Sequence, residues 1–444
     1  MTGIGGVGMS ALAAALLAKG NTVTGSDRAH DEGFETPSLT KLQRLGVRLH
    51  SQNGSGITSD TTALIVSTAI EEDNQDLAAA RKIGCPILRR AEMLAELVGD
   101  SECVAVTGTS GKTTVTGMAG WVLTFLGANP TIVNGGPVLN WVTDTGLGSV
   151  HDGRDDFWVV EADESDRSLM SFRPDWAVIT NISADHFSME DSMDLFLDFA
   201  RNVKIGIIST AEVASMLRSH FGSLPGNRFI EVECNVYSRD SEWYFQIHGE
   251  DMKSPLPGRH NAENALLAVA LCMRLGYSQK EVGWALSQFH GIERRLQVLE
   301  SSRDITVIDD YAHNPAKIKA AWNAASAMGK RVLGVWRPHG YGPFAQMADD
   351  LVMTFRECMQ SRDMFYILDV YYAGGSVNRL ITSREYAERL RDNSIAAEYV
   401  EGYERLDGIL KKTVEAGDVV LFMGARDHEL PLFARRFAED LKSR

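Results

Sequence analysis

Short apolar runs alternate with amphipathic stretches along most of the chain. Each run ends in a turn and is followed by a segment whose apolar residues have helical spacing. In chain order the runs are TALIVST, CVAVTGT, FWVVEAD, WAVITNI, ITVIDDY, RVLGVW, MFYILDV and VVLFMGA. This alternation predicts parallel sheets built from β-α-β units, and therefore an α/β fold.

The βα units fall into three series. A glycine loop at 3–8 opens the first, a second glycine loop at 108–114 opens the next, and the third begins with ITVIDDY after GIERRLQV. We therefore expect a Rossmann-like N-terminal domain, a P-loop central ATPase domain and a Rossmann-like C-terminal domain, at 1–98, 99–296 and 297–444. The chain of 444 residues is long enough for that number of domains. Residues 225–256 are expected to form β-hairpins inserted in the middle domain.

Composition excludes several classes of protein. The formal net charge of −15 disfavours nucleic acid as a partner, because it repels phosphates. The cysteines are five, an odd number without a C-x-x-C pair, which favours free thiols in a reducing compartment over disulfides or zinc. No apolar run reaches the length of a membrane span, and the apolar N-terminus lacks a basic leader. We expect a cytoplasmic enzyme without membrane insertion.

The strongest motif is GTSGKTT at 108–114, which lies between a predicted strand and a predicted helix. Such a loop points backbone N–H groups and a helix N-terminus at a phosphate. Lys112 is then expected to reach the β- and γ-phosphates, and the Thr113 hydroxyl to bind Mg²⁺. Val106 replaces the first glycine of the full template, so the loop is a shortened variant; the flanking strand and helix argue against a chance turn. The residues expected to bind the ATP phosphates are Gly108, Thr109, Ser110, Gly111, Lys112, Thr113 and Thr114.

Acidic and imidazole groups follow the next two strands, in EADESD at 161–166 and TNISADH at 180–186. The carboxyl ends of parallel strands form the ligand-binding edge of an open α/β sheet. Glu161 is a good second ligand for Mg²⁺, and His186 is a candidate ligand for a further metal ion. We expect Lys112, Glu161 and His186 to be catalytic. The remaining acids of the first motif belong either to this site or to a solvated loop; they are Asp163, Glu164 and Asp166.

The loop at 3–8 matches the dinucleotide fingerprint G-x-G-x-x-G, with Asp27 about 20 residues further on. The fingerprint binds a pyrophosphate, so NAD and a UDP-sugar are both compatible with it. Only Met1 and Thr2 precede Gly3, where the motif requires a strand. Either the native start lies upstream or the sheet lacks its usual first strand.

Two further segments offer polar groups to a nucleotide. In PGRHNAENALLAVALC, Asn261 and Asn264 lie one helical turn apart near His260, and their amides suit an adenine edge; helix capping is the alternative. In DDYAHNP, Asp310 is a candidate for a ribose hydroxyl and His313 for a phosphate. A histidine near a strand end is also often only a structural hydrogen-bonding residue.

In this order, the motifs resemble the Mur ligase family, and most closely its alanine-adding members. The resemblance covers nearly the whole chain and rests on GIGGVGMSALA, GSD, STAI, RRAEMLAEL, GTSGKTT, EADESD, TNISADH, GRHNAENA, the arginine pair 294–295 and DDYAHNP. It implies that the first domain binds the UDP part of a substrate, the middle domain ATP, and the third the incoming amino acid. It also implies that ATP phosphorylates a carboxylate and that an amine then attacks the acyl phosphate, giving an amide and phosphate.

The resemblance implies three sets of binding residues. The UDP-sugar site would comprise Gly3, Gly5, Gly6, Gly8, Met9, Ser10, Ser26, Asp27 and Ser67. The ATP site would extend beyond the phosphate loop to His260, Asn261, Asn264, Arg295 and Asp310. The amine site would comprise His313, Arg337, His339 and Arg426.

The third domain departs from the family where the amine should bind. Alanine-adding members carry arginines that hold the amino acid carboxylate, whereas this chain has Gly340 and Pro343 at those positions. Another arginine must replace them, or the amine is not simple L-alanine; the candidates are Arg337, Arg379 and Arg426. We favour Arg426 because it follows the strand-like run VVLFMGA. The alternative is a surface ion pair between Arg426 and Asp427 or another acid.

The sequence therefore predicts an ATP- and Mg²⁺-dependent ligase of peptidoglycan precursor synthesis. Its substrates would be UDP-N-acetylmuramic acid and an amino acid, with L-alanine favoured. The nearest alternative is a recycling ligase that attaches a short preformed peptide to the same UDP-sugar. A folylpolyglutamate synthase-like enzyme is a more distant alternative, because the first glycine domain is not part of that scheme. A non-catalytic binding relative is disfavoured by the intact Lys112, Thr113, Glu161 and His186. An NAD-dependent dehydrogenase rests on the first glycine loop alone.

Overall fold

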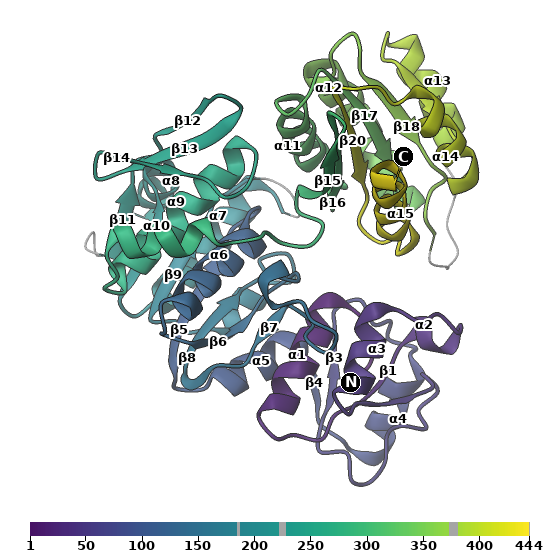
Figure 1. Ribbon diagram of the computed structural model, residues 1–444. Coiled ribbons are helices and arrows are strands. Elements are labelled where there is room, and N and C mark those ends of the chain that lie inside the picture. The colour runs from purple at the N-terminus through teal and green to yellow at the C-terminus, as the bar shows by residue number, and fades with distance from the viewer. Residues whose placement is uncertain (184–186, 222–227, 373–380, 444) are drawn as a thin grey trace. The chain divides into compact units, whose positions relative to one another are not determined.

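The computed structural model describes residues 1–183, 187–221, 228–372 and 381–443 (Figure 1). Parallel-rich sheets with helices packed on them confirm the predicted α/β class. The chain divides into two units. The first comprises Met1–Tyr237, Tyr244–Pro255 and Asn261–Glu293, and the second comprises Ser238–Trp243, Leu256–His260 and Arg294–Arg444. The three predicted domain ranges remain a prediction.

Two short parallel pairs of strands open the first unit. The elements here are α1 (Val7–Ala18), β1 (Thr24–Ser26), α2 (Arg28–Asp31), α3 (Pro37–Arg44), β2 (Arg48–His50), β3 (Leu64–Val66), α4 (Gln75–Ile83), β4 (Ile87–Arg89) and α5 (Arg90–Val98). β1 pairs with β2, and β3 pairs with β4. Thr2 forms parallel bridges to Ser26 on one side and Val66 on the other, so it lies between the two pairs and leads directly into the glycine loop.

A seven-stranded sheet forms the rest of the first unit's core, with the order β11-β10-β9-β5-β8-β6-β7. Its strands are β5 (Glu102–Thr107), β6 (Pro130–Val133), β7 (Val150–His151), β8 (Arg154–Glu161), β9 (Trp176–Ile179), β10 (Gly206–Thr210) and β11 (Phe229–Val232). Only the β6–β7 pair is antiparallel among these described strands. The carboxyl ends of the parallel strands therefore share one edge.

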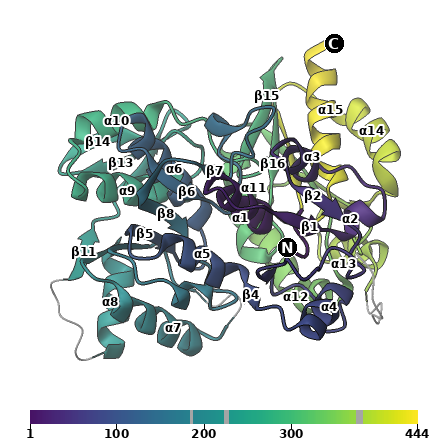
Figure 2. The same cartoon turned by 90° about the horizontal axis from the view of Figure 1, so that it is seen from below.

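Helices cover both faces of this sheet: α6, α9 and α10 lie on one face, and α7 and α8 on the other (Figures 1 and 2). Their bounds, with two 3-10 helices, are α6 (Lys112–Phe125), η1 (Leu139–Trp141), η2 (Ser168–Ser171), α7 (Met189–Asn202), α8 (Ala211–Phe221), α9 (Arg259–Arg274) and α10 (Gln279–Ser287). Part of the segment 225–256, predicted to form β-hairpins, forms a small three-stranded sheet, whereas its residues 229–232 form β11 of the seven-stranded sheet. The three-stranded sheet consists of β12 (Val236–Arg239), β13 (Glu242–Ile247) and β14 (Glu250–Lys253).

The second unit is built on a six-stranded sheet of order β15-β16-β20-β17-β18-β19. Its strands are β15 (Gln297–Ser302), β16 (Ile305–Asp310), β17 (Arg331–Trp336), β18 (Met364–Ile367), β19 (Ala397–Tyr399) and β20 (Asp418–Met423). Its helices are α11 (Pro315–Ser326), α12 (Tyr341–Cys358), α13 (Ser383–Asp392), α14 (Gly402–Thr413) and α15 (Glu429–Ser443). All described pairs except β15–β16 are parallel.

The central strand β20 is apolar at every position from Val419 to Met423, and its packing explains why. Val419, Leu421 and Met423 pack into a core with residues of α11, α12 and α13. Val420 and Phe422 point the other way, into a core with α14 and α15. Because successive side chains of a strand alternate between the two faces, a strand covered on both sides needs a continuous apolar run.

No helix among the described residues is long and apolar enough to cross a membrane.

Candidate active site

The loop between β5 and α6 requires glycine at two positions. Gly108 and Gly111 have φ angles of +130° and +85°, which only glycine adopts without strain. A side chain at Gly108 would collide with the Thr180 hydroxyl, and one at Gly111 with the Asn264 amide. The loop therefore passes close to other parts of the unit and leaves its backbone, not side chains, facing the space above the helix N-terminus.

The loop is also fixed by the segment that follows β9. The Asn181 amide accepts a hydrogen bond from the Ser110 N–H at 3.0 Å and donates one to the Ser110 carbonyl at 2.9 Å. The Thr180 hydroxyl donates to the same carbonyl at 2.6 Å. The loop conformation is thus set before any ligand binds, which reduces the ordering cost of binding.

Lys112, the first residue of α6, lies folded back over the loop. Its Nζ donates to the Gly108 carbonyl at 2.9 Å, lies 3.5 Å from Asp163 and forms an ion pair with Glu164. Burial by itself lowers the pKa of Lys112, but the carboxylates of Asp163, Glu164 and Glu161 outweigh burial and raise it. The ammonium is therefore charged and is held by acids that a nucleotide phosphate would replace.

The two acids beside Lys112 differ in charge state. Burial raises the pKa of Asp163, yet Lys112 and the donors of Ser165 lower it to about 2. Burial is the largest influence on Glu164 and raises its pKa to about 7, with Asp163 adding to the rise and Lys112 opposing it. Glu164 is only 4% exposed, so the alternative of a solvated loop charge is wrong for this residue.

Thr113 and Glu161 offer oxygen ligands side by side. The Thr113 hydroxyl donates to Glu161 Oε1 at 3.2 Å, and the Gly135 N–H donates to Oε2 at 2.8 Å. Mg²⁺ takes oxygen ligands and keeps several waters, so two protein oxygens next to a phosphate loop fit it. Within the described residues there is no group of three or more acidic, histidine or cysteine side chains that would suit a metal needing a full protein cage. His186, the other expected ligand, lies outside the described residues.

Asn261 and Asn264 are buried in α9, and their amides are 3.4 Å apart. The helix begins at Arg259, so both residues lie within it and neither is its N-cap residue. Asn264 is the residue against which Gly111 packs, so α9 reaches the phosphate loop. Burial lowers the pKa of the nearby His260 to about 4, so this histidine is neutral.

In the first glycine loop, Asp27 performs a structural task. One carboxylate oxygen accepts from the Gly5 N–H at 2.8 Å, and the other accepts from the Ala29 N–H at 3.0 Å and caps α2. The N-cap of α1, Gly6, has no side chain to satisfy the helix's first N–H groups. A pyrophosphate would accept hydrogen bonds from those N–H groups.

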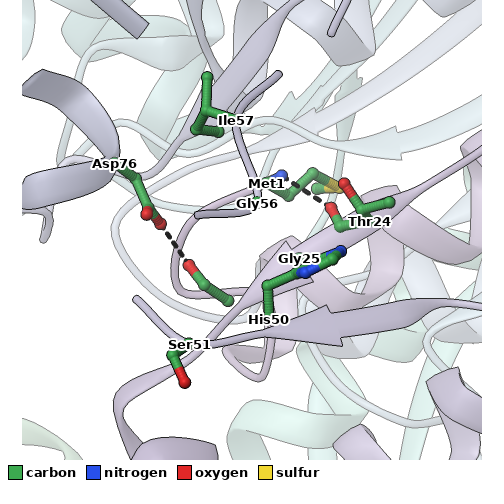
Figure 3. Close-up of a pocket in the computed structure, with 9 residues that line it drawn as sticks. Met1, Thr24, Gly25, His50, Ser51, Gly56, Ile57 and Asp76 are labelled. Carbon is green, nitrogen blue, oxygen red and sulfur yellow. Dashed lines mark hydrogen bonds between the residues drawn. The ribbon is translucent and has the colours of Figure 1, made fainter. Parts of the chain in front are cut away.

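A small pocket lies beside β1 and β2 (Figure 3). It is lined by Met1, Thr24, Gly25, Ser26, His50, Ser51, Gly56, Ile57 and Asp76. Asp76 is buried and accepts from the Thr2 hydroxyl at 3.0 Å, the Ser26 hydroxyl at 2.5 Å and the Gly54 N–H at 2.8 Å. The Ser26 hydroxyl is therefore already occupied, and the pocket contains no residue of the glycine loop.

In the second unit, two histidines meet at the carboxyl edge of the sheet. The rings of His313, after β16, and His339, after β17, have centroids 5.4 Å apart. His313 Nδ1 lies 3.0 Å from the Tyr311 carbonyl. Burial is the largest influence on both rings, and it lowers the pKa of His313 to about 4 and that of His339 below its ordinary value. Both are neutral at pH 7.

Arg337 and Asp427 form an ion pair at the same edge, in which Asp427 is buried and Arg337 is partly buried. Arg337 Nη1 lies 2.7 Å from Asp427 and 3.1 Å from the Tyr403 hydroxyl, which itself donates to Asp427. The guanidinium lies 5.6 Å from the ring centre of Tyr371 and 5.4 Å from that of Tyr403. The expected alternative, a pair between Arg426 and Asp427, is wrong, because Asp427 is bound by Arg337.

Asp310, expected at a ribose hydroxyl, is bound to the backbone. Its two oxygens accept from the N–H groups of Leu296 and Ala312, each at 2.7 Å. The adjacent Asp309 is paired with Arg294 at 3.2 Å. A ribose contact by Asp310 remains a prediction that would use the remaining lone pairs.

Comparison with known proteins decides the family. The profiles of the Mur ligase family catalytic domain, the Mur ligase middle domain and the Mur ligase glutamate ligase domain match residues 1–101, 106–272 and 294–426. This chain belongs to the Mur ligase family. As a member it is an ATP-dependent ligase, and the dehydrogenase alternative is wrong.

Relatives of this Mur ligase cover nearly the whole chain. UDP-N-acetylmuramate–L-alanine ligases of Sinorhizobium medicae and Mesorhizobium japonicum are 32% and 34% identical over 95% of this chain and 93% and 94% of their own. The solved UDP-N-acetylmuramate–alanine ligase of Thermotoga maritima has a TM-score of 0.79 at 27% identity and covers 100% of this chain and 98% of its own. A murein peptide ligase of Psychrobacter arcticus shares the fold, with a TM-score of 0.70 at 21% identity, over 99% and 98% of the two chains.

Several residues of this Mur ligase site were not predicted. Asn181 and Gly135 follow strands, as the predicted residues do, but nothing in their sequence context shows that Asn181 binds the Ser110 backbone or that the Gly135 N–H donates to the Glu161 carboxylate. Met9 and Ser10, expected at the UDP-sugar, are buried within α1, so a contact from them would come through the backbone. The Ser67 hydroxyl accepts from the Ala69 N–H at 3.3 Å.

Proposed function

We propose that this ligase joins the carboxylate of UDP-N-acetylmuramic acid to the amine of an amino acid, with L-alanine as the favoured amine. The names of the relatives that cover nearly the whole chain support this choice. The product would be a peptidoglycan precursor. We place the reaction in the cytoplasm, where ATP and UDP-sugars are available.

The position of Lys112 carries the proposal. Its charged ammonium lies over the glycine loop and is paired with Asp163 and Glu164. When ATP binds, its phosphates would replace these carboxylates as partners of the ammonium. Phosphoryl transfer needs mainly positioning and charge neutralisation, which the loop N–H groups and Lys112 supply. Thr113 and Glu161 would hold Mg²⁺, which would supply positive charge that neutralises the phosphates.

The reaction then proceeds in two steps, a phosphoryl transfer and an acyl transfer. A carboxylate oxygen of the UDP-sugar attacks the γ-phosphorus, the bond to the β-phosphate oxygen breaks, and ADP leaves. The amine nitrogen attacks the acyl carbon, the carbon–oxygen bond to phosphate breaks, and the nitrogen loses its proton. The glycine loop at 3–8 would bind the pyrophosphate of the UDP-sugar, and the loops after β16, β17 and β20 would bind the amine.

The test is phosphate release from ATP in the presence of UDP-N-acetylmuramic acid and a panel of L-alanine, glycine, L-serine and a tripeptide. We expect release that depends on both the UDP-sugar and L-alanine. Lys112→Ala should reduce turnover by about a thousandfold or more, because it removes a charge that neutralises the transferring phosphate, while circular dichroism remains unchanged. Near-native turnover of that variant would refute the phosphate-loop assignment, and release with the tripeptide alone would favour the peptide-adding alternative.

A further inference from the structure

Arg426 lies at the same edge of the sheet as His339. Trp336 and Met423 are register partners in β17 and β20, and the Arg337 N–H donates to the Met423 carbonyl at 3.0 Å. His339 lies three positions after Trp336, and Arg426 lies three positions after Met423. The positive charge of Arg426 contributes to the lowered pKa of His339, after burial.

The side chain of Arg426 is exposed, and no carboxylate in the described part of the chain is paired with it. Its backbone is nevertheless fixed on both sides. The Arg294 guanidinium donates to the carbonyls of Gly424 and Ala425, the latter at 3.4 Å. On the other side, Asp427 is 2% exposed, is paired with Arg337 and accepts from the Glu429 N–H at 2.9 Å. An arginine with a fixed backbone and a free guanidinium differs from an ordinary surface arginine.

Among the described residues, the other candidate cations at this edge are already engaged; Arg379, the third candidate arginine, lies outside the described residues. Arg337 is bound to Asp427 and Tyr403 and stacked on two tyrosine rings. Breaking a buried ion pair to bind a ligand would leave Asp427 uncompensated. His313 and His339 are neutral and bring no charge. The guanidinium of Arg295 lies 5.3 Å from the ring centre of Tyr311.

We infer that Arg426 receives the α-carboxylate of the incoming amino acid, and that Arg337 is a positioning residue that holds the Arg426 loop. The inference rests on the proposed function and specifies its amine as one with a carboxylate close to the nitrogen. The guanidinium fork matches a carboxylate with two parallel hydrogen bonds. His339, beside it, would contact the same substrate.

The experiment compares L-alanine with L-alaninamide, which has the same amine but no carboxylate. The enzyme should prefer L-alanine in kcat/KM by about tenfold to a hundredfold, the range expected for hydrogen bonds to a charged group. In Arg426→Gly the preference should fall to within about threefold, through a raised KM for L-alanine. Arg426→Lys should lie between the two. Arg436→Lys, at an exposed arginine within α15, is the matched control and should keep the preference.

Hydroxylamine separates failure of the inference from failure of the proposed function. It attacks the acyl phosphate without needing a carboxylate site, and the hydroxamate formed is measured by its colour with iron. Hydroxamate formation with an unchanged L-alanine preference in Arg426→Gly would overturn the role of Arg426. Absence of hydroxamate in the unmodified enzyme with ATP and UDP-N-acetylmuramic acid would overturn the proposed function and the inference together. If Arg337 positions the loop and Arg426 binds the amino acid, Arg337→Lys should lower the melting temperature and Arg426→Lys should leave it unchanged.

Discussion

Glu164→Gln should make the protein more stable, and only at high pH. The carboxyl is 4% exposed and lies beside Asp163 and Lys112, and burial raises its pKa to about 7 from an ordinary value of 4.5. The folded state therefore binds this proton more tightly than the unfolded chain. The corresponding stability is fully present below pH 4.5 and is lost as the pH rises through 7.

The magnitude follows from the two pKa values. Their difference of about 2.5, at 1.36 kcal/mol per pKa unit, corresponds to about 3 kcal/mol. Glutamine has a similar shape and never ionises, so it avoids the cost of a buried anion. At pH 8 the variant should be more stable by about 3 kcal/mol, and at pH 5 by less than about 1 kcal/mol, because Glu164 is then mostly protonated.

Thermal unfolding at pH 5 and pH 8 measures the difference. At about 2–4 °C per kcal/mol, 3 kcal/mol should raise the melting temperature by about 6–12 °C at pH 8. Glu190→Gln, at an exposed position in the first turn of α7, is the control and should show no such pH dependence. An equal gain at both pH values, or a lower melting temperature at pH 8, would refute the reasoning about Glu164.

Two further predictions test the structure away from Lys112. Asp427→Asn removes the buried charge that faces Arg337, so urea unfolding should show that the free energy of unfolding falls by about 3 kcal/mol. Asp440→Asn, which affects a more exposed pair with Lys411, should lower it by less than about 1 kcal/mol, and equal losses would contradict the burial argument. Asp27→Asn weakens the acceptor that holds the Gly5 N–H, so calorimetry should show weaker binding of UDP-N-acetylmuramic acid and no binding of NAD to either protein; tight NAD binding without UDP-sugar binding would refute the assignment of this loop.

The residues that sequence alone could place are those with local causes. A continuous apolar run such as 419–423 indicates a strand covered on both faces, and Gly108 and Gly111 with Lys112 between a strand and a helix indicate a phosphate loop. These features depend on neighbours within a few positions in the chain. Their physical requirement is visible in the residue types themselves.

The residues that sequence could not place depend on distant partners. Asn181 binds the backbone of Ser110 at a chain separation of 71, and any polar side chain after a strand would have looked equally suitable. A pair between Asp427 and its neighbour Arg426 was the alternative to amine binding by Arg426, but the parallel register of β17 and β20 brings Asp427 to Arg337 instead. Burial of Glu164 likewise depends on packing that no local pattern encodes.

The neighbouring strands β17 and β20 place the loops that begin with Arg337 and Gly424 side by side, although the paired residues Arg337 and Asp427 are 90 positions apart in the chain. If both loops shape the amine site, amine preference is a two-locus trait. A substitution in one loop alone would leave the contacts from the other loop suited to the original amine. Directed evolution toward a new amine would then need libraries that diversify both segments together, and recombination between homologues would work best when both segments come from the same parent.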